Sequence, residues 1–215
     1  MNELVPEFND SLLIDSSDII GDYLELGIDS ILDNESLKEI PIIKTFIGVG
    51  KITKSIRERN LMKNLAIFIN ELNSGKIDKE KLSKHKEELR QNPRKAEKEL
   101  GRILIILEQT IDNIKSSILG KLYKAYINQE IDWDGFAEFS EITNRLFMFD
   151  INILNVMWSK EYNAYIEQKD DNFRIERMYS LGIIGNIFPS INETKHLHGR
   201  VLNGLGKKYC DIIFR

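Results

Sequence analysis

Six basic residues near the C-terminus are the side chains of this sequence best suited to contact nucleic acid. Arginine and lysine bind phosphate oxygens and give a salt-dependent affinity, whereas contacts to base edges add sequence choice. Residues 172–215 hold seven Lys or Arg and three Asp or Glu, although the whole chain has a formal charge of -4. The predicted nucleic-acid contacts are Arg174, Arg177, Lys195, Arg200, Lys207 and Lys208. Nucleic-acid binding is the alternative interpretation of the tail, and docking on the rest of the chain or on a partner is the favoured one.

A glycine-rich segment, Gly48-Val49-Gly50-Lys51, has part of the pattern of a phosphate-binding loop. Such a loop needs an earlier glycine and a Ser or Thr directly after the lysine. Thr45 occupies the glycine position and Ile52 follows the lysine, so the pattern is incomplete. We expect small residues that let helices approach closely, and no cofactor.

Metal binding and nucleophilic catalysis find little support in the residue types. His196 and His198, with Glu193 and Cys210, are the nearest approach to a zinc site, but a structural zinc needs about four ligands at recognisable spacing. Cys210 lies in an amphipathic segment and is expected to be a buried, structural thiol. His85 lies in a charged segment and is expected to be solvated. The sequence therefore predicts no catalytic residue, no metal and a protein that is not an enzyme.

Apolar residues recur at three- and four-residue spacing through most of the chain, which is typical of amphipathic helices. Ser or Asp caps and proline starts mark several of the helix beginnings. A polar break is expected at 57–60. The predicted helices span residues 17–32, 41–56, 61–72, 78–91, 93–111, 114–127, 132–146 and 150–160. Short helices joined by short turns predict antiparallel neighbours in a bundle.

Composition and charge exclude several classes of protein. Hydrophobic residues make up 42% of the 215 residues and charged residues 30%, which is typical of a folded globular chain. The acidic start at 1–10 does not resemble a secretory signal, and the single cysteine suits a reducing compartment, so a cytoplasmic location is expected. Net charge is -9 over residues 1–48, +1 over 49–171 and +4 over 172–215. Opposite poles predict internal docking or two different surfaces.

The apolar helix predicted at 41–56 has two further interpretations. Its longest apolar stretch is interrupted by Lys44, so a membrane-spanning helix is not expected. Ile, Phe and Gly on one face with lysines at the flank is also a pattern of helices that lie in a membrane interface. The residues that would form such an interface are Ile42, Ile43, Phe46 and Ile47. Packing in the bundle or in a homodimer would bury the same stripe, and core packing is the favoured interpretation.

The tail carries a family resemblance. A helix over 172–180 ends in Leu181-Gly182-Ile183-Ile184, and after a variable loop comes Leu202-Asn203-Gly204-Leu205-Gly206-Lys207-Lys208-Tyr209. This order resembles the end of a winged-helix domain, in which recognition helix, wing and closing helix follow one another. The resemblance implies a small winged-helix-like basic segment over residues 166–215. Together with the helical spacing of residues 1–165, it predicts a mainly α protein with a multi-helix bundle followed by this segment.

The arrangement as a whole is similar to that of uncharacterised helical proteins of bacteria, prophages and other mobile elements. An acidic N-terminal helix, the segment Lys38-Glu39-Ile40-Pro41-Ile42-Ile43, a helical middle and the basic tail carry this resemblance. It implies a role in host-phage conflict, as defence or as counter-defence. The leading hypothesis is a non-enzymatic module that binds a protein partner or a second copy of itself. The alternatives are a DNA-binding regulator that uses the tail and a membrane-active effector that uses the apolar helices.

Overall fold

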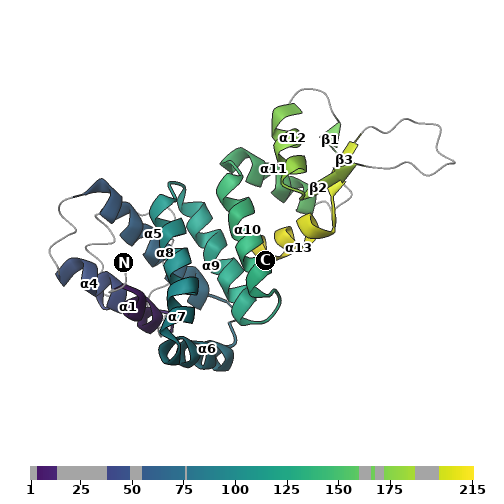
Figure 1. Ribbon diagram of the computed structural model, residues 1–215. Helices are drawn as coiled ribbons and strands as arrows, with labels where there is room; N and C mark the ends of the chain where they lie inside the picture. The colour runs from purple at the N-terminus through teal and green to yellow at the C-terminus, as the bar shows by residue number, and fades with distance from the viewer. Residues whose placement is uncertain are drawn as a thin grey trace, which may run out of the picture. The chain divides into compact units, whose positions relative to one another are not determined.

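The computed structural model of the chain is mainly helical and divides into two compact units, residues 1–140 and 141–215 (Figure 1). It describes residues 4–13, 38–48, 55–75, 77–159, 166–167, 172–186 and 199–215. The helix predicted at 17–32 lies outside the described residues. Among the described helices, none is both long enough and apolar enough to cross a membrane.

The N-terminal unit is built from helices alone among its described residues. They are α1 (Leu4–Ser11), α4 (Pro41–Gly48), α5 (Ile56–Asn73), α6 (Lys79–Gln91), α7 (Pro93–Ala96), the π-helical turn η2 (Glu97–Gly101), α8 (Arg102–Gln109), α9 (Asn113–Ile127) and most of α10 (Trp133–Arg145). Helix α5 packs along both α8 and α9, and the three lie side by side in Figure 1. Helix α1 packs against α4, α6 and η2.

The core of this unit follows from the spacing of its apolar residues. Leu61, Leu65, Phe68 and Leu72 recur along one stripe of α5 and are buried. Gly120 of α9 allows the close approach of α5, because a Cβ at this position would lie 2.9 Å from the backbone oxygen of Phe68. The packing of α5 on α9 therefore depends on both an apolar stripe and a position without a side chain.

Most of the expected helix boundaries are confirmed. The expected end of the helix that begins at Pro41 and the expected start of the next helix are wrong. Asp78 accepts hydrogen bonds from the first turn of α6, Asn92 caps α7 ahead of Pro93, and the carboxylate of Asp132 accepts from the N–H of Gly135. The helix that begins at Pro41 was expected to reach residue 56, followed by a polar break at 57–60. Instead, Ser55 has extended backbone geometry, its hydroxyl accepts from the N–H of Arg57, and α5 begins at Ile56. A serine cap therefore starts a new helix where polar side chains predicted a break.

The C-terminal unit combines helices with a small antiparallel sheet. Its elements after α10 are α11 (Met148–Ser159), β1 (Ile166–Glu167), α12 (Asn172–Ser180), β2 (Ile184–Asn186), β3 (Gly199–Leu202) and α13 (Gly204–Ile213). The strand order is β1-β3-β2, with Gly185 opposite Val201 in the hairpin of β2 and β3. Figure 1 shows α12 next to this sheet, and α12 contacts β2.

The expected domain boundary and the boundary between the compact units differ. The sequence predicts a division between residues 165 and 166, whereas the units divide between Ser140 and Glu141, inside α10. The physical reason is that α11 packs against α13, and the indole N–H of Trp158 donates to Asp211 at 3.0 Å. These contacts group the helices of residues 141–159 with the tail.

Candidate functional site

Three exposed phenylalanines of the C-terminal unit are combined with two arginines. Phe147 and Phe149 lie at the start of α11 and Phe173 in the first turn of α12, with exposed fractions of 61%, 48% and 63%. The Arg174 guanidinium lies 3.7 Å from the ring centroid of Phe149 and 5.3 Å from that of Phe173. The Arg177 guanidinium lies 4.4 Å from the ring centroid of Phe147. We call these five side chains the aromatic-arginine surface.

A buried carboxylate positions one of the two arginines. Asp150 is fully buried, and its two oxygens accept from Nε and one terminal nitrogen of Arg177 at 2.9 and 3.0 Å. The same carboxylate accepts from the N–H of Phe147 at 2.8 Å, which satisfies a free donor at the N-terminus of α11. Bidentate pairing fixes the plane of a guanidinium. Asp150 therefore joins α11 to α12 and holds Arg177 against the ring of Phe147.

A second arginine group lies around the end of α12. Arg200 of β3 pairs with Glu176 at 2.9 Å and donates to the side chain of Asn186 on β2. Its guanidinium also lies 4.2 Å from the ring centroid of Tyr179. Arg200 therefore connects the sheet to α12 and has a carboxylate partner within the chain.

Three of the six residues predicted to contact nucleic acid already contact other side chains of the chain. Arg177 and Arg200 have carboxylate partners within the chain, and Arg174 lies on aromatic rings. Lys207 and Lys208 are exposed in α13, and Lys195 lies outside the described residues. Residues 141–215 hold nine Asp or Glu and ten Lys or Arg, a net charge of +1. The +4 of the tail is therefore offset by acidic residues of the same compact unit.

The residues predicted for a membrane interface lie in the core of the N-terminal unit. Ile42 is fully buried, Ile43 and Phe46 are also buried, and Ile47 is half-buried. The N–H of Ile42 donates to the hydroxyl of Ser11 at 2.9 Å, so the beginning of α4 is attached to α1. An apolar face that packs within a domain cannot contact lipid unless the helix detaches. The structure thus favours the core-packing interpretation of these four residues.

The histidine and cysteine predictions have mixed outcomes. Cys210 is fully buried, and burial raises the pKa of its thiol to about 12. His85 was expected to be solvated and this is wrong, because its side chain is only 10% exposed. The sequence contained the signal, because His85 shares a helix face with the buried Leu82 and Leu89. His196 and His198 lie outside the described residues, within which no cluster of His, Cys, Asp or Glu could hold a metal.

His85 belongs to a polar network in the interior of the N-terminal unit. Its Nε2 lies 3.0 Å from the hydroxyl of Tyr123 and 3.1 Å from a carboxylate oxygen of Glu99, which is nearly fully buried on η2. Tyr126 donates to the other oxygen of Glu99 at 3.1 Å. Burial, followed by the nearby Glu99 carboxylate, raises the pKa of Tyr126 above its ordinary value. This network connects α6, η2 and α9 and explains why η2 can hold a carboxylate in the interior.

The exposed phenylalanines were not predicted as site residues. Sequence periodicity assigns an apolar residue to a buried face, and Phe147 and Phe149 flank the start of a helix where the face is ambiguous. The arginines near them in space were singled out for their charge alone. Comparison with known protein families, characterised proteins and solved structures gives no match to the chain. Fold and surface thus define a mainly helical protein of two compact units with an aromatic-arginine surface on the second.

Proposed function

We propose that the chain is a protein-binding module and that the aromatic-arginine surface contacts the partner. The observation that carries this proposal is the exposure of Phe147, Phe149 and Phe173 beside Arg174 and Arg177. Aromatic residues and arginine are enriched in protein interfaces and contribute many of their strongest contacts. Single exposed apolar residues need no explanation, but here Arg174 lies over the rings of both Phe149 and Phe173, and Arg177 lies over the ring of Phe147.

The charge around this surface supports a protein partner over a phosphate backbone. Asp150 neutralises Arg177, and Glu176 neutralises Arg200. Nucleic-acid affinity depends on lysines and arginines that neutralise phosphates, so ion pairs within the chain lower it. The partner that fits is an apolar protein surface, because three of the five side chains are exposed aromatic rings and Arg177 is already paired with a buried carboxylate.

The test compares three purified, tagged proteins in affinity capture from nuclease-treated lysate of the source cell. One is the wild type, one carries Phe147→Ser, Phe149→Ser and Phe173→Ser, and one carries Val156→Ser as a matched change. Val156 is 51% exposed and lies on α11, outside the aromatic-arginine surface. We expect a stoichiometric protein that is retained by the wild type and the Val156 variant and is lost with the three phenylalanines.

Self-association is measured on the same three proteins by analytical ultracentrifugation. A dimer that dissociates only in the triple variant would identify a second copy as the partner. The proposal fails if no captured protein and no oligomer depends on the phenylalanines. Circular dichroism and thermal melting confirm that each variant is folded before the comparison is made.

DNA binding by the tail is the second candidate, favoured by the order of elements. Helix α12, the β2-β3 hairpin and α13 follow one another as in the end of a winged-helix domain, and Lys207 and Lys208 are exposed on α13. A helix-turn-helix domain also needs a helix directly ahead of its recognition helix. Only residues 168–171 lie between β1 and α12, and four residues are too few to form such a helix.

A further inference from the structure

Asn203 and Gly204 form a dipeptide that can undergo a spontaneous covalent change. Asn203 is the only asparagine of the sequence that a glycine directly follows. In such a pair the backbone nitrogen of the glycine can attack the side-chain amide carbon of the asparagine, because no Cβ hinders its approach. Gly204 is exposed, and a Cβ at this position would meet no atom within 4 Å. The space around the attacking nitrogen is therefore open.

The reaction converts the side-chain amide of Asn203 into a cyclic imide. A bond forms between the backbone nitrogen of Gly204 and the Cγ of Asn203, and the bond between Cγ and Nδ2 breaks. The proton of the Gly204 N–H leaves with Nδ2 as ammonia. Water then opens the ring, at Cγ to give aspartate or at the backbone carbonyl carbon to give isoaspartate. Solvent water is thus the only other reactant.

The side chain of Asn203 attaches the start of α13 to a distant turn. Its Oδ1 accepts from the N–H of Gly206 at 2.9 Å, and its Nδ2 donates to the backbone oxygen of Gly182 at 2.6 Å. Its backbone N–H also donates to the backbone oxygen of Ile183 at 3.3 Å. Gly182 and Ile183 lie between α12 and β2, so one residue connects this turn to α13. The group that the reaction removes is the donor to Gly182.

Conversion replaces that donor by an acceptor. An ionised aspartate has no N–H, so a carboxylate oxygen would face the backbone oxygen of Gly182, and two acceptors cannot bond to each other. The bond from Gly206 can persist in aspartate, because aspartate caps a helix about as well as asparagine does. Isoaspartate also adds a side-chain carbon to the path of the main chain and displaces the cap. We propose that Asn203 is a deamidation site and that its conversion detaches the start of α13 from the turn between α12 and β2.

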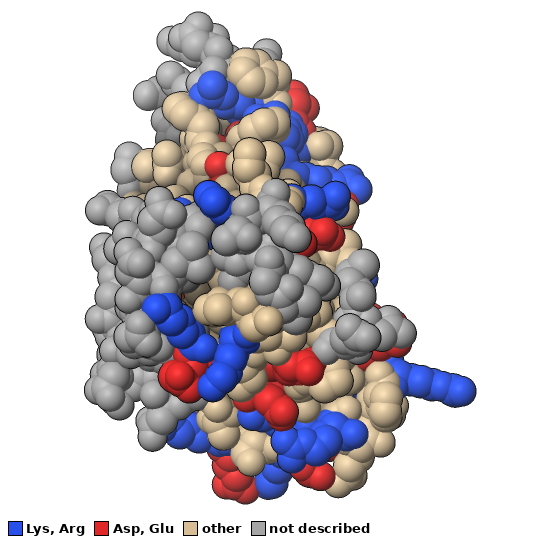
Figure 2. All heavy atoms as spheres, turned by 90° about the vertical axis from the view of Figure 1, so that its left-hand side faces the viewer, with Lys and Arg blue, Asp and Glu red and all other residues tan. Residues whose placement is uncertain are grey.

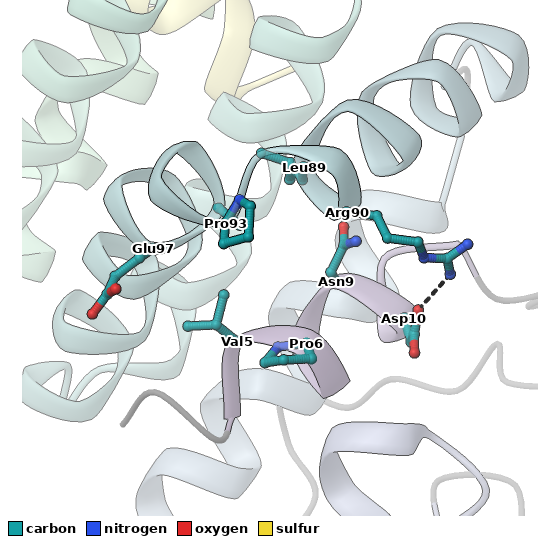
Figure 3. A pocket seen from close by; sticks show the side chains of 9 residues that line it. Val5, Pro6, Asn9, Asp10, Leu89, Arg90, Pro93 and Glu97 are labelled. Carbon is teal, nitrogen blue, oxygen red and sulfur yellow. Dashed lines mark hydrogen bonds and ion pairs between the residues drawn. The ribbon is translucent and has the colours of Figure 1, made fainter.

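The first test incubates the folded, full chain at mildly alkaline pH, followed by peptide mapping with mass spectrometry. We expect aspartate and isoaspartate to accumulate at position 203. Asn9 is the internal control and should stay unchanged, because it is buried, its Nδ2 donates to the backbone oxygen of Lys86 at 3.1 Å, and Asp10 follows it on α1 (Figure 3).

Gly204→Ala is the matched variant for the reaction. Its Cβ hinders the attacking nitrogen and meets no other atom of the fold within 4 Å, so conversion at Asn203 should be several-fold slower while α13 keeps its cap. An unchanged Asn203 in the wild type, or equal rates in the wild type and the Gly204→Ala protein, would overturn the assignment of the site.

The second test measures the consequence of conversion by thermal melting. Asn203→Asp should melt about 2–4 °C below the wild type, whereas Asn155→Asp, which adds the same charge at an exposed asparagine of α11, should melt close to it. The deamidated wild type, separated by ion exchange, gives the same comparison without a substitution. Equal melting temperatures for the Asn203→Asp and Asn155→Asp proteins, or for the intact and deamidated wild type, would contradict the detachment of α13.

Discussion

Asp150 joins two helices of the C-terminal unit through a single carboxylate. It accepts from the N–H of Phe147 and from two nitrogens of Arg177 while it is fully buried. Removal of one member of a buried pair leaves the other without a partner, which costs more than the loss of an exposed pair. Arg177 therefore has a structural role, and an Arg177→Ala change would report on folding as well as on binding.

Replacement of Asp150 by alanine should lower the free energy of unfolding by about 2–3 kcal/mol. This loss is somewhat smaller than the loss expected on breaking a fully buried ion pair, because the Arg177 side chain is 26% exposed. The measurement is urea unfolding followed by circular dichroism. Glu141→Ala, which breaks the exposed pair with Arg145, is the control and should cost less than about 1 kcal/mol. Equal losses in the two variants would contradict the structural role of Asp150.

The thiol of Cys210 should be unreactive in the folded chain. Burial raises its pKa to about 12, so at pH 8 roughly one thiol in ten thousand is ionised, and the thiolate is the reactive species. An aromatic disulfide reagent should modify Cys210 slowly at pH 8 and rapidly in urea, where the unfolded thiol has a pKa near 8.5. Because the folded pKa is raised, this group stabilises the fold below about pH 8.5 and loses that contribution as the pH rises toward 12. Rapid labelling of the folded chain would contradict its burial.

Helices of both units depend on individual close contacts at their first turns. Helix α13 begins after Asn203, whose side chain accepts from the N–H of Gly206 at 2.9 Å and donates to the backbone oxygen of Gly182 at 2.6 Å. Helix α4 begins with its Ile42 N–H bound to Ser11 of α1, a residue distant in sequence. Such contacts determine where a helix starts and which element it packs against.

Gly206→Ala should destabilise the C-terminal unit by about 1–3 kcal/mol, because a Cβ at this position would overlap the carbonyl group of Ile183, which is backbone and cannot rotate away. Gly204→Ala is the matched control in the same helical turn, since a Cβ there would meet no atom within 4 Å. Thermal melting of the two variants checks the prediction. A Gly206→Ala protein as stable as the Gly204→Ala protein would show that α13 does not pack this closely on Ile183.

Ser11→Ala should cost about 1 kcal/mol of unfolding free energy, because the N–H of Ile42 would lose its acceptor in the interior. Ser159→Ala at the exposed end of α11 is the comparison, and its effect should stay within about 0.5 kcal/mol. Guanidinium unfolding provides the two values. If Ser11→Ala is neutral, water or another group must satisfy the start of α4.

At the scale of the molecule, the net charge of the C-terminal unit bears on its partners. On the face shown in Figure 2, basic and acidic side chains are interspersed among the described residues. The C-terminal unit has a net charge of +1 because acidic residues of 141–171 offset the basic tail. Long-range attraction of nucleic acid needs a concentrated positive field, and a nearly neutral unit supplies little of it.

Binding of labelled duplex DNA at 150 mM salt should therefore be no tighter than a dissociation constant of about 1 μM, the range of non-specific contacts. Fluorescence anisotropy measures this dissociation constant, with salt varied from 50 to 200 mM. The variant is Lys207→Ala combined with Lys208→Ala, because both lysines are exposed and their removal leaves Asp150 paired with Arg177. Submicromolar, sequence-dependent binding that the double variant abolishes would favour the DNA-binding candidate over the protein-binding module.

The mainly helical fold and most helix boundaries are determined by the sequence. Amphipathic spacing and caps such as Asp78, Asn92 and Asp132 act over a few residues, so the sequence alone contains the information. The burial of Cys210 was predicted on the same basis and is confirmed. The mobile-element context, the cytoplasmic location and the non-enzymatic role remain predictions.

Only the tertiary structure decided which charged and aromatic residues are available at the surface. The roles of Arg177 and Arg200 depend on Asp150 and Glu176, residues 27 and 24 positions away. The attachment of Asn203 depends likewise on the distant backbone of Gly182. Local periodicity carries no information about such pairs, because ion pairing and burial are set by whatever the fold brings within a few ångströms. The sequence therefore determined the helices of this protein, and the packing of those helices decided its candidate sites.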